Sequence, residues 1–439
     1  SRNDNGSVSS VAGYKTLTLA RLAGNGGHIH LRTDMETDTS DSIRVTESLS
    51  GNHTLHVKGS GAGELKQTQT ESYLARVENT ATDKPGSFTL ANPGGKVDAG
   101  LYNYILASRD AAGATEWYLT RGTKEDGTPD YSPTADAVLA MASAGAQNAL
   151  YQNNLMDLRK RLGEVRDGVR DGLWVSVAGW KDNLSGYAGS QFRQEAYSVS
   201  FGLDHAINEN WLIGANLRAT IADQKTHGHE NRHATGDADS QGLNLYATWT
   251  HENGTYADFV ASVDRYGQEI STSMLDGTQT KGKYHNRGYG LSAEIGRKFA
   301  QLGNDKTWFI EPQAQLSWYH VRGDSFNMNN GMRIKQDDAD SLTARVGIVA
   351  GRDLKLENDR KGQYYLKAGV NHELSGEQTV RLNNVRFEEN EIMGTRFYYG
   401  AGMDWELDKN TKFYGQIERE EGSHYTREIE VRFGLKRSF

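Results

Sequence analysis

The chain has 439 residues, a formal net charge of −8 and a mean hydropathy of −0.70. A soluble chain of this length would form two or three domains. With no run of about eighteen apolar residues, hydropathy gives no support to an α-helical membrane protein, although a membrane β-barrel is still allowed because its strands alternate. The acidic balance argues against a nucleic-acid partner. The chain lacks cysteine, and because it begins at Ser1 without an apolar signal segment we expect a mature chain or a fragment.

The first 120 residues or so consist of short alternating runs, for example at 14–19, 42–45 and 53–57. Glycine-rich turn signals separate them, as at 24–27 and 59–63. Short strands at this spacing are typical of a β-sandwich or a solenoid.

A polar linker at 121–131 leads into a predicted helix. Ser132 is a candidate N-cap and Pro133 suits the first helical position. The Ala-, Leu- and Met-rich stretch from 135 to about 161 predicts one helix of about 40 Å. Arg159, Lys160 and Arg161 lie near its far end, where cations interact favourably with the helix dipole.

From Gly172 onward, apolar and polar residues alternate with a period of two. We count about twelve alternating segments, each with roughly 9 to 11 residues that could cross a bilayer when tilted. Their cores lie near 173–181, 195–205, 210–222, 241–251, 255–267, 286–299, 307–319, 341–355, 363–374, 394–407, 411–420 and 425–439.

The connections between these segments alternate in length. Tight turns at 208–210, 252–254 and 408–410 alternate with long polar stretches at 223–240 and 268–285. Short turns on one side and long loops on the other are typical of bacterial outer-membrane barrels.

The last strand shows the period most clearly. One side carries apolar residues and the other carries Gly434 and the charged residues, and the chain stops on the aromatic Phe439. In an outer-membrane barrel the apolar side would face lipid and the charged side the lumen. The apolar side comprises Ile429, Val431, Phe433 and Leu435, and the other side comprises Glu428, Glu430, Arg432, Gly434 and Lys436.

The order of these parts, with the motifs at 173–175, 310–316, 431–433 and 438–439, resembles type Va autotransporters. The resemblance implies an all-β fold in which 172–439 form a 12-stranded transmembrane antiparallel β-barrel. The linker, 122–171, would carry an α-helix through the pore. Residues 1–121 would be the capped end of a right-handed parallel β-helix, the autochaperone part of a pertactin-like passenger.

The resemblance also implies a function and partners. The barrel would lie among the lipid and lipopolysaccharide of the bacterial outer membrane and export its passenger, an adhesin or an aggregation or virulence factor, toward a host or neighbouring cell. Val431, Phe433 and Phe439 would form the signal that the barrel assembly machinery reads, with periplasmic chaperones delivering the chain. No cofactor or metal is implied.

The linker cations would then have lumen partners. Arg159, Lys160 and Arg161 would face lumen carboxylates, because a lumen in which both charge signs are satisfied costs less than an unpaired cluster. The carboxylates that we expect there are Glu406, Glu418 and Glu428.

Self-cleavage is the sharpest chemical hypothesis. Asn153-Asn154 lies in a linker that resembles that of the secreted serine-protease autotransporters, where an Asn side-chain amide attacks its own carbonyl with help from acids of the barrel wall. Matching strand motifs assign the wall acids to Asp258, Glu294 and Glu311, which we expect in the lumen. Counting back from Arg166-Asp167 instead places the cleavage position at 156–157. The alternative is that both asparagines are ordinary polar helix residues and that the acids pair with linker arginines.

Other functional classes leave weaker signals. His227, His229 and His233 lie in a loop that we expect to be solvated, without the fixed ligand geometry of a metal site. An outer-membrane barrel enzyme, such as a protease or esterase, would not need the long helix. A soluble all-β binding protein is the third alternative, and extraction without detergent would distinguish it.

Overall fold

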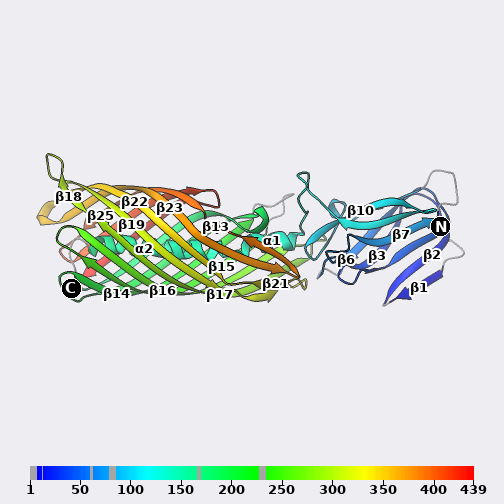
Figure 1. Cartoon of the computed structure of the whole chain (residues 1–439), viewed down its shortest axis with the longest axis horizontal. Coiled ribbons are helices and arrows are strands. Elements are labelled where there is room, and N and C mark those ends of the chain that lie inside the picture. Colours follow the sequence, from blue (N-terminus) through cyan, green and yellow to red (C-terminus); the bar gives the residue numbers. More distant parts are fainter. Residues whose placement is uncertain (1–6, 12, 60–62, 79–85, 166–169, 227–233) are drawn as a thin grey trace.

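The computed structural model describes residues 7–11, 13–59, 63–78, 86–165, 170–226 and 234–439, with side chains outside 7–11 and 156–165. Two bodies follow one another along the long axis, a strand-rich N-terminal body and a barrel (Figure 1). The C-terminus lies at the barrel end that is far from the N-terminal body.

The N-terminal body is built from parallel stacks of strands. β2 (Tyr14–Leu22), β5 (Ser42–Leu49) and β7 (Glu71–Glu78) stack in one sheet, and β3 (Gly27–Asp34), β6 (Asn52–Gly59) and β8 (Ser87–Leu90) in another. The short β1 (Ser7–Val11) and β4 (Thr39–Ser40) pair at the edges. Apolar side chains such as Val45, Leu55 and Val77 fill the space inside. The parallel β-helix predicted from the sequence is confirmed.

Three antiparallel strands close the end of this β-helix. β9 (Lys96–Ala99), β10 (Tyr102–Ala111) and β11 (Ala114–Arg121) form a meander, and β11 pairs antiparallel with β7. A β-helix needs such a cover because its last coil would otherwise present unpaired backbone groups. Trp117 of this cap packs edge-on against Phe88 of the last parallel coil, with ring centroids 5.1 Å apart.

The linker forms two helices where the sequence predicted one. α1 (Pro133–Met141) is capped by Ser132, whose hydroxyl accepts from the Ala135 amide at 3.2 Å, and α2 (Gly145–Val165) follows a three-residue break. Barrel side chains satisfy the backbone groups that the break frees. Tyr284 donates to the Met141 carbonyl at 2.7 Å, and Gln378 accepts from the Ala144 amide at 2.7 Å. Because the partners come from distant strands, helix propensity could not predict the break.

Among the described residues, neither helix combines the length and the apolar character needed to cross a membrane.

Twelve long strands form the barrel. Each pairs antiparallel with the next, and the last pairs with the first, where Ser438 lies opposite Gly172. The strands are β12 (Gly172–Ser185), β13 (Gln191–Ala206), β14 (Trp211–Thr226), β15 (Thr235–Thr250), β16 (Thr255–Ser273), β17 (Gln279–Arg297), β19 (Trp308–Arg322), β22 (Ala339–Lys355), β23 (Lys361–Leu382), β25 (Thr395–Glu406), β26 (Thr411–Gly422) and β27 (Tyr425–Ser438).

Several strands are longer than predicted on the long-loop side. β16 and β17 have 19 residues each, so most of the stretch 268–285, expected to be a loop, is strand. The short β20 (Ser325–Asn327), β21 (Arg333–Gln336) and β24 (Val385–Glu389) extend β23 on the same side. β18 (Phe299–Leu302) extends β19 at the opposite end. The extensions of β16 and β17 consist mostly of polar residues, so no apolar face marks them as strand.

Side chains that point out of the barrel are apolar, and side chains that point into it are polar. On β13, Tyr197 and Phe201 point outward and are 58% and 53% exposed, whereas Ser198 and Ser200 are buried inside. An apolar outer surface with a polar interior is the pattern of a barrel in lipid.

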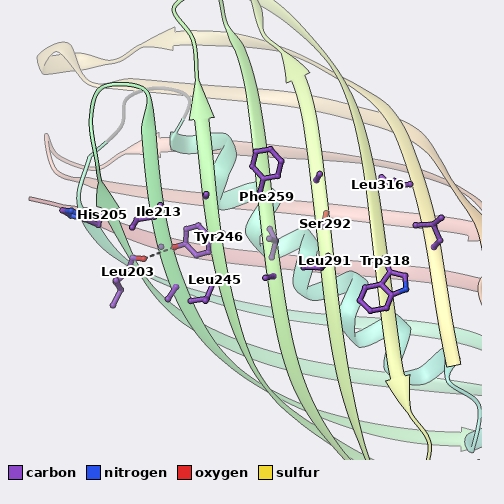
Figure 2. Close-up of a pocket in the computed structure, with 17 residues that line it drawn as sticks. Leu203, His205, Ile213, Leu245, Tyr246, Phe259, Leu291, Ser292, Leu316 and Trp318 are labelled. Carbon is purple, nitrogen blue, oxygen red and sulfur yellow. Dashed lines mark hydrogen bonds between the residues drawn. The ribbon is translucent and has the colours of Figure 1, made fainter. Parts of the chain in front are cut away.

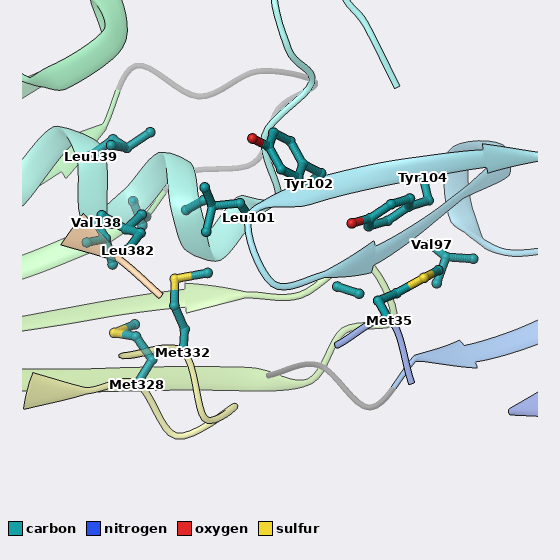
Figure 3. Packing of buried hydrophobic residues seen from close by; sticks show 14 of the residues in the cluster. Met35, Val97, Leu101, Tyr102, Tyr104, Val138, Leu139, Met328, Met332 and Leu382 are labelled. Carbon is teal, nitrogen blue, oxygen red and sulfur yellow. The ribbon is translucent and has the colours of Figure 1, made fainter. Parts of the chain in front are cut away.

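Apolar residues close the mouth of the barrel beneath the β-helix cap. Val138 and Leu139 of α1 pack with Met332, with Leu382 of β23 and with Leu101 of the cap (Figure 3). The cap, the linker and the barrel therefore share one core.

Candidate functional site

Helix α2 is hydrogen-bonded to the wall of the pore. The guanidinium of Arg432, on β27, donates to the side-chain Oδ1 of Asn153 at 2.7 Å and to its backbone carbonyl at 3.2 Å. The Asn153 amide donates to Glu430 at 3.1 Å. These groups are at most 2% exposed. A buried helix residue is thus held at three atoms by the last strand of the barrel.

The wall groups belong to a continuous ion-pair chain. Glu430 accepts from Arg432 at 3.0 Å and from Arg427 at 2.7 Å, and Arg427 also donates to Asp182 of β12 at 3.0 Å. Buried charges are tolerated only when they are paired and hydrogen-bonded, and each of these groups is paired with an opposite charge. The chain also crosses the β12–β27 seam and so connects the helix to the closure of the barrel.

A β-bulge makes this chain possible. The pairing of β12 with β27 shifts between Lys181 and Asp182, so that Arg427 and Glu430 both face the lumen although they are three residues apart. Glu428 is displaced to the outer face, where it accepts from Arg193 at 3.1 Å. The expectation that Glu428 faces the lumen is wrong, because strict alternation ends at the bulge.

Aromatic residues hold the helix on the opposite wall. The ring of Tyr151 stacks on Tyr319 of β19 with centroids 4.0 Å apart. Gly290 of β17 leaves the necessary room, because a Cβ there would lie 2.4 Å from the Tyr151 ring. Arg218, paired with Asp264, donates to the Leu150 carbonyl at 3.3 Å. One turn of α2 therefore has partners on several strands.

Asn154 contacts a third part of the wall. It exchanges two 3.0 Å hydrogen bonds with Asn244 of β15, and Asn244 also donates to Asn216 of β14 at 2.9 Å. All three side chains are buried. The amide ladder fixes the depth of the helix in the lumen.

The N-terminal body docks on the loop end of the barrel. Glu36 pairs with Arg333 of β21 at 3.2 Å, and Asp98 accepts from the Leu275 amide at 2.8 Å. Burial raises the pKa of the Glu64 carboxyl, which accepts from the Asn383 side chain. The passenger-like body thus sits at the same end of the barrel as the long strands.

Two family models match this chain. The autotransporter β-domain model matches residues 173–418, more than half of the chain, and the pertactin model matches residues 5–121. The chain belongs to the autotransporter β-domain family. This autotransporter is an outer-membrane translocator with its passenger segment on the cell-surface side.

Known autotransporters resemble it in sequence and fold. It is 29% identical to the pertactin autotransporter of Bordetella bronchiseptica over 449 residues, covering 93% of this chain and 47% of the relative. It is 28% identical to the autotransporter adhesin/invasin TibA of Escherichia coli, covering 97% of this chain and 46% of the relative. The translocator domain of NalP from Neisseria meningitidis shares the fold, with a TM-score of 0.53, 17% identity and coverage of 69% and 99%. The chain spans about a quarter to a half of the length of the curated relatives that it matches.

The three wall acids of the cleavage hypothesis lie together in the autotransporter pore. Asp258, Glu294 and Glu311 are buried on the neighbouring strands β16, β17 and β19, and Asp258 lies directly opposite Glu294. The Tyr256 hydroxyl donates to Glu294 at 3.2 Å and to Glu311 at 3.1 Å. They form one acidic patch on the inner wall.

This patch and the two asparagines lie at different depths. Asn154 bonds to Asn244, which pairs with Ser262, and Asp258 follows four residues away on β16, about 13 Å along the strand. Asn153 bonds to β27 instead. The alternative position 156–157 has side chains outside the described set, as do Arg159, Lys160 and Arg161. The cleavage assignment stays a prediction.

The other expected carboxylates have partners on the wall. Glu418 is buried and pairs with Lys367, and Glu406 lies 3.7 Å from Lys412 near the short turns. His227, His229 and His233 lie outside the described residues, and among those described no group of three or more metal-ligating side chains is found.

Sequence reasoning missed the residues that hold the helix. Tyr151, Arg218 and Asn244 carried no motif, and Arg432 was recognised only as a lumen residue. A signal was present in Gly290, since a glycine at an inward position of a strand often marks a close approach. Their partners are 90 or more residues distant in several cases, so only the fold reveals the pairs.

Proposed function

We propose that the autotransporter exports its passenger through the barrel and then anchors it by the helix that remains in the pore. The observation that supports this most directly is the bonding of Asn153 to Arg432 and Glu430, which ties the linker to the last strand. A helix that is hydrogen-bonded on several sides is held in place, because its departure would leave buried charged and amide groups without hydrogen-bond partners.

Cysteine cross-linking tests this anchored state, since the chain has no cysteine of its own. Asn154→Cys with Asn244→Cys should form a disulfide in outer-membrane fractions of cells whose passenger is digested by external protease. Asn154→Cys with Thr343→Cys, on β22, is the control pair and should stay reduced. A folded barrel with a surface-exposed passenger but no cross-link in the first pair rejects the anchored helix.

We propose further that the passenger acts in adhesion, aggregation or virulence, with a host or neighbouring cell as its partner. The similarity to TibA, which is named an adhesin/invasin, supports this role. Cells that display the chain should aggregate or bind epithelial cells more than cells that display a variant lacking residues 7–121. Equal binding by the two strains contradicts the role for this segment.

The division of labour along the chain is part of the proposal. Residues 1–121 would be the passenger end with its autochaperone cap, 122–171 the linker and 172–439 the barrel. Val431 and Phe433 face outward on β27, and the Phe439 side chain is 75% exposed. Exposed apolar groups on the final strand suit recognition by the barrel assembly machinery after delivery by periplasmic chaperones.

Self-cleavage is a second candidate function. Nδ2 of Asn153 would attack the carbonyl carbon of Asn153 and pass one of its protons to a wall carboxylate. The bond to Asn154 would then break, which leaves a succinimide at Asn153, and the new α-amine would take up the proton from that wall acid. Burial of both asparagines and the Arg432 contact to the Asn153 carbonyl favour this chemistry, because a cation at that oxygen stabilises the oxyanion.

Intact-mass spectrometry of the purified barrel tests the cleavage. A fragment that begins between Asn154 and Asp157, absent in Asn153→Gln, would support cleavage. Asp258→Asn, Glu294→Gln and Glu311→Gln should slow it if these acids transfer the protons. Full-length chain alone in the wild type removes the hypothesis and leaves the anchoring role intact.

A further inference from the structure

Three arginines stand in a row on the outer wall of the barrel. Arg265 of β16 lies directly opposite Arg287 of β17, and Arg287 lies directly opposite Arg322 of β19. All three side chains are exposed and point away from the lumen. The register therefore brings three positive charges together on adjacent strands.

This arrangement is unfavourable by itself. Like charges directly opposite one another destabilise a sheet. Within the described part of the chain, none of the three guanidinium groups forms an ion pair or a side-chain hydrogen bond with the protein. On the β19 flank of the row, Asp340 accepts from His320 at 3.0 Å, and Asp338 accepts from the Gly323 amide at 2.8 Å. The described part of the chain therefore supplies no anion that pairs with the row.

The row lies at the edge of the apolar outer surface. The next outward-facing residues on these strands, two positions closer to the short turns, are Val263, Tyr289 and His320. Tyrosine prefers the headgroup level of a membrane, so its position next to the row marks that level. The arginines therefore lie where the phosphates of outer-leaflet lipids are found, on the side of the long strands and the passenger.

An apolar groove begins below the row. It has a volume of about 840 Å³, and Leu291 and Trp318 at one end are four residues, about 13 Å, from Arg287 and Arg322 (Figure 2). Small side chains from four neighbouring strands form its floor while larger apolar residues form its sides. The floor consists of Ala215, Ala247, Ala261 and Ala293.

We propose that the Arg265–Arg287–Arg322 row binds the phosphate of an outer-leaflet glycolipid whose acyl chain lies in the groove. Guanidinium groups bind phosphate oxygens through paired, charge-assisted hydrogen bonds, so one phosphate relieves the repulsion among three arginines. The groove distinguishes a lipid from a free phosphate ion, because only a lipid can occupy both the arginine row and the apolar groove. The inference rests on the outer-membrane location and adds a defined lipid site to it.

Native mass spectrometry of the full chain in detergent tests this site, with bis-phosphorylated lipid A as the probe. The variant Arg265→Gln/Arg287→Gln/Arg322→Gln should bind lipid A at least about tenfold more weakly than wild type, equivalent to about 1.4 kcal/mol. The matched control Arg297→Gln/Lys306→Gln/Lys409→Gln removes three exposed cations at the opposite end of the barrel and should bind as wild type. Equal loss in both variants, or none in the first, overturns the site.

Two further measurements separate the parts of the site. Dephosphorylated lipid A should bind wild type as weakly as phosphorylated lipid A binds the arginine variant. Ala261→Phe, which fills the groove floor, should weaken binding while leaving the arginines intact. If inorganic phosphate at an equal concentration displaces lipid A, the row is a simple anion site and the lipid proposal fails.

Folding of the variant is checked without lipid. Heat-modifiable gel mobility reports a closed barrel, and the unfolding midpoint in lipid-free detergent should be the same as or higher than that of wild type, because three repelling charges are removed. A lower lipid-free midpoint would mean that the row has a structural role within the protein and would overturn the proposal.

Discussion

Arg432 on the final strand donates 2.7 Å and 3.2 Å hydrogen bonds to the side chain and the backbone carbonyl of Asn153 in the pore helix. The contact joins the linker to the strand that completes the barrel. It explains why a helix with few apolar residues is stable inside a polar tube.

Arg432→Met should therefore loosen the pore helix. The change leaves Glu430 with one arginine fewer and removes both bonds to Asn153, and breaking a buried ion pair typically costs about 3–5 kcal/mol. We expect a lower unfolding midpoint in urea and more frequent channel openings in planar bilayers. Arg437→Gln is the control, since this exposed arginine on the same strand pairs with Asp408 at the rim. A closed channel of unchanged stability in Arg432→Met would refute the lock.

Val431→Asp should destabilise the barrel by about 2 kcal/mol. Val431 lines an outer pocket with Tyr197 and Phe433 and so faces lipid, where a carboxylate is disfavoured by an amount that depends on depth. Urea unfolding in lipid vesicles measures the change, with Val431→Ala as the size control. Equal midpoints for the two variants would place the side chain outside the hydrocarbon.

Deletion of Phe439 should impair assembly without weakening the assembled barrel. Phe439 is 75% exposed. Its backbone N–H donates a hydrogen bond to the Asp171 carbonyl at 3.2 Å, at the end of the strand, so the deletion removes little packing. We expect less barrel in outer membranes of growing cells, but an unchanged unfolding midpoint after refolding into vesicles in vitro. Normal levels in cells would show that this residue is not part of the assembly signal.

The passenger segment should lose stability in strong acid through Asp41. The Arg32 guanidinium, with the Lys15 and Arg32 amides, lowers the pKa of the Asp41 carboxyl to about 2. Since its ordinary pKa is 3.8, the stabilisation is complete above that pH and is lost as the pH falls toward about 2.

Asp41→Asn tests this dependence. We follow urea unfolding by tryptophan fluorescence, to which Trp117 is the contribution of residues 1–121. The urea midpoint of the passenger transition should be lower in Asp41→Asn than in wild type at pH 7, and the two midpoints should converge near pH 2. Glu47→Gln is the control because its pair with Arg21 is exposed, and such surface pairs contribute little. A constant difference from pH 7 to pH 2 would assign the effect to something other than ionisation.

The sequence predicted the architecture because each element leaves a local signal. Alternation in strands such as β13 and the cap at Ser132 depend on near neighbours, and both predictions are confirmed. The missed features depend on distant partners. Glu428 turns outward at a bulge set by the pairing with Asp182, and the helix breaks where Tyr284 and Gln378 receive its backbone.

Part of the candidate site could also be predicted from the sequence, and part could not. The acids Asp258, Glu294 and Glu311 could be placed on the inner wall from alternation alone, since period two decides the face. The depth of Asn153 and Asn154 relative to them could not, because it depends on the shear of the barrel and on the position of the helix along its axis.

The β12–β27 seam has a thermodynamic consequence. Arg432 contacts the helix, Arg427 contacts the first strand, and both pair with Glu430, so occupancy of the tube and closure of the ring are linked equilibria. Because such coupling is reciprocal, the bound helix stabilises the closed ring by the same free energy by which the closed ring stabilises binding of the helix. A barrel emptied of its linker is therefore also one that opens more readily between its first and last strands.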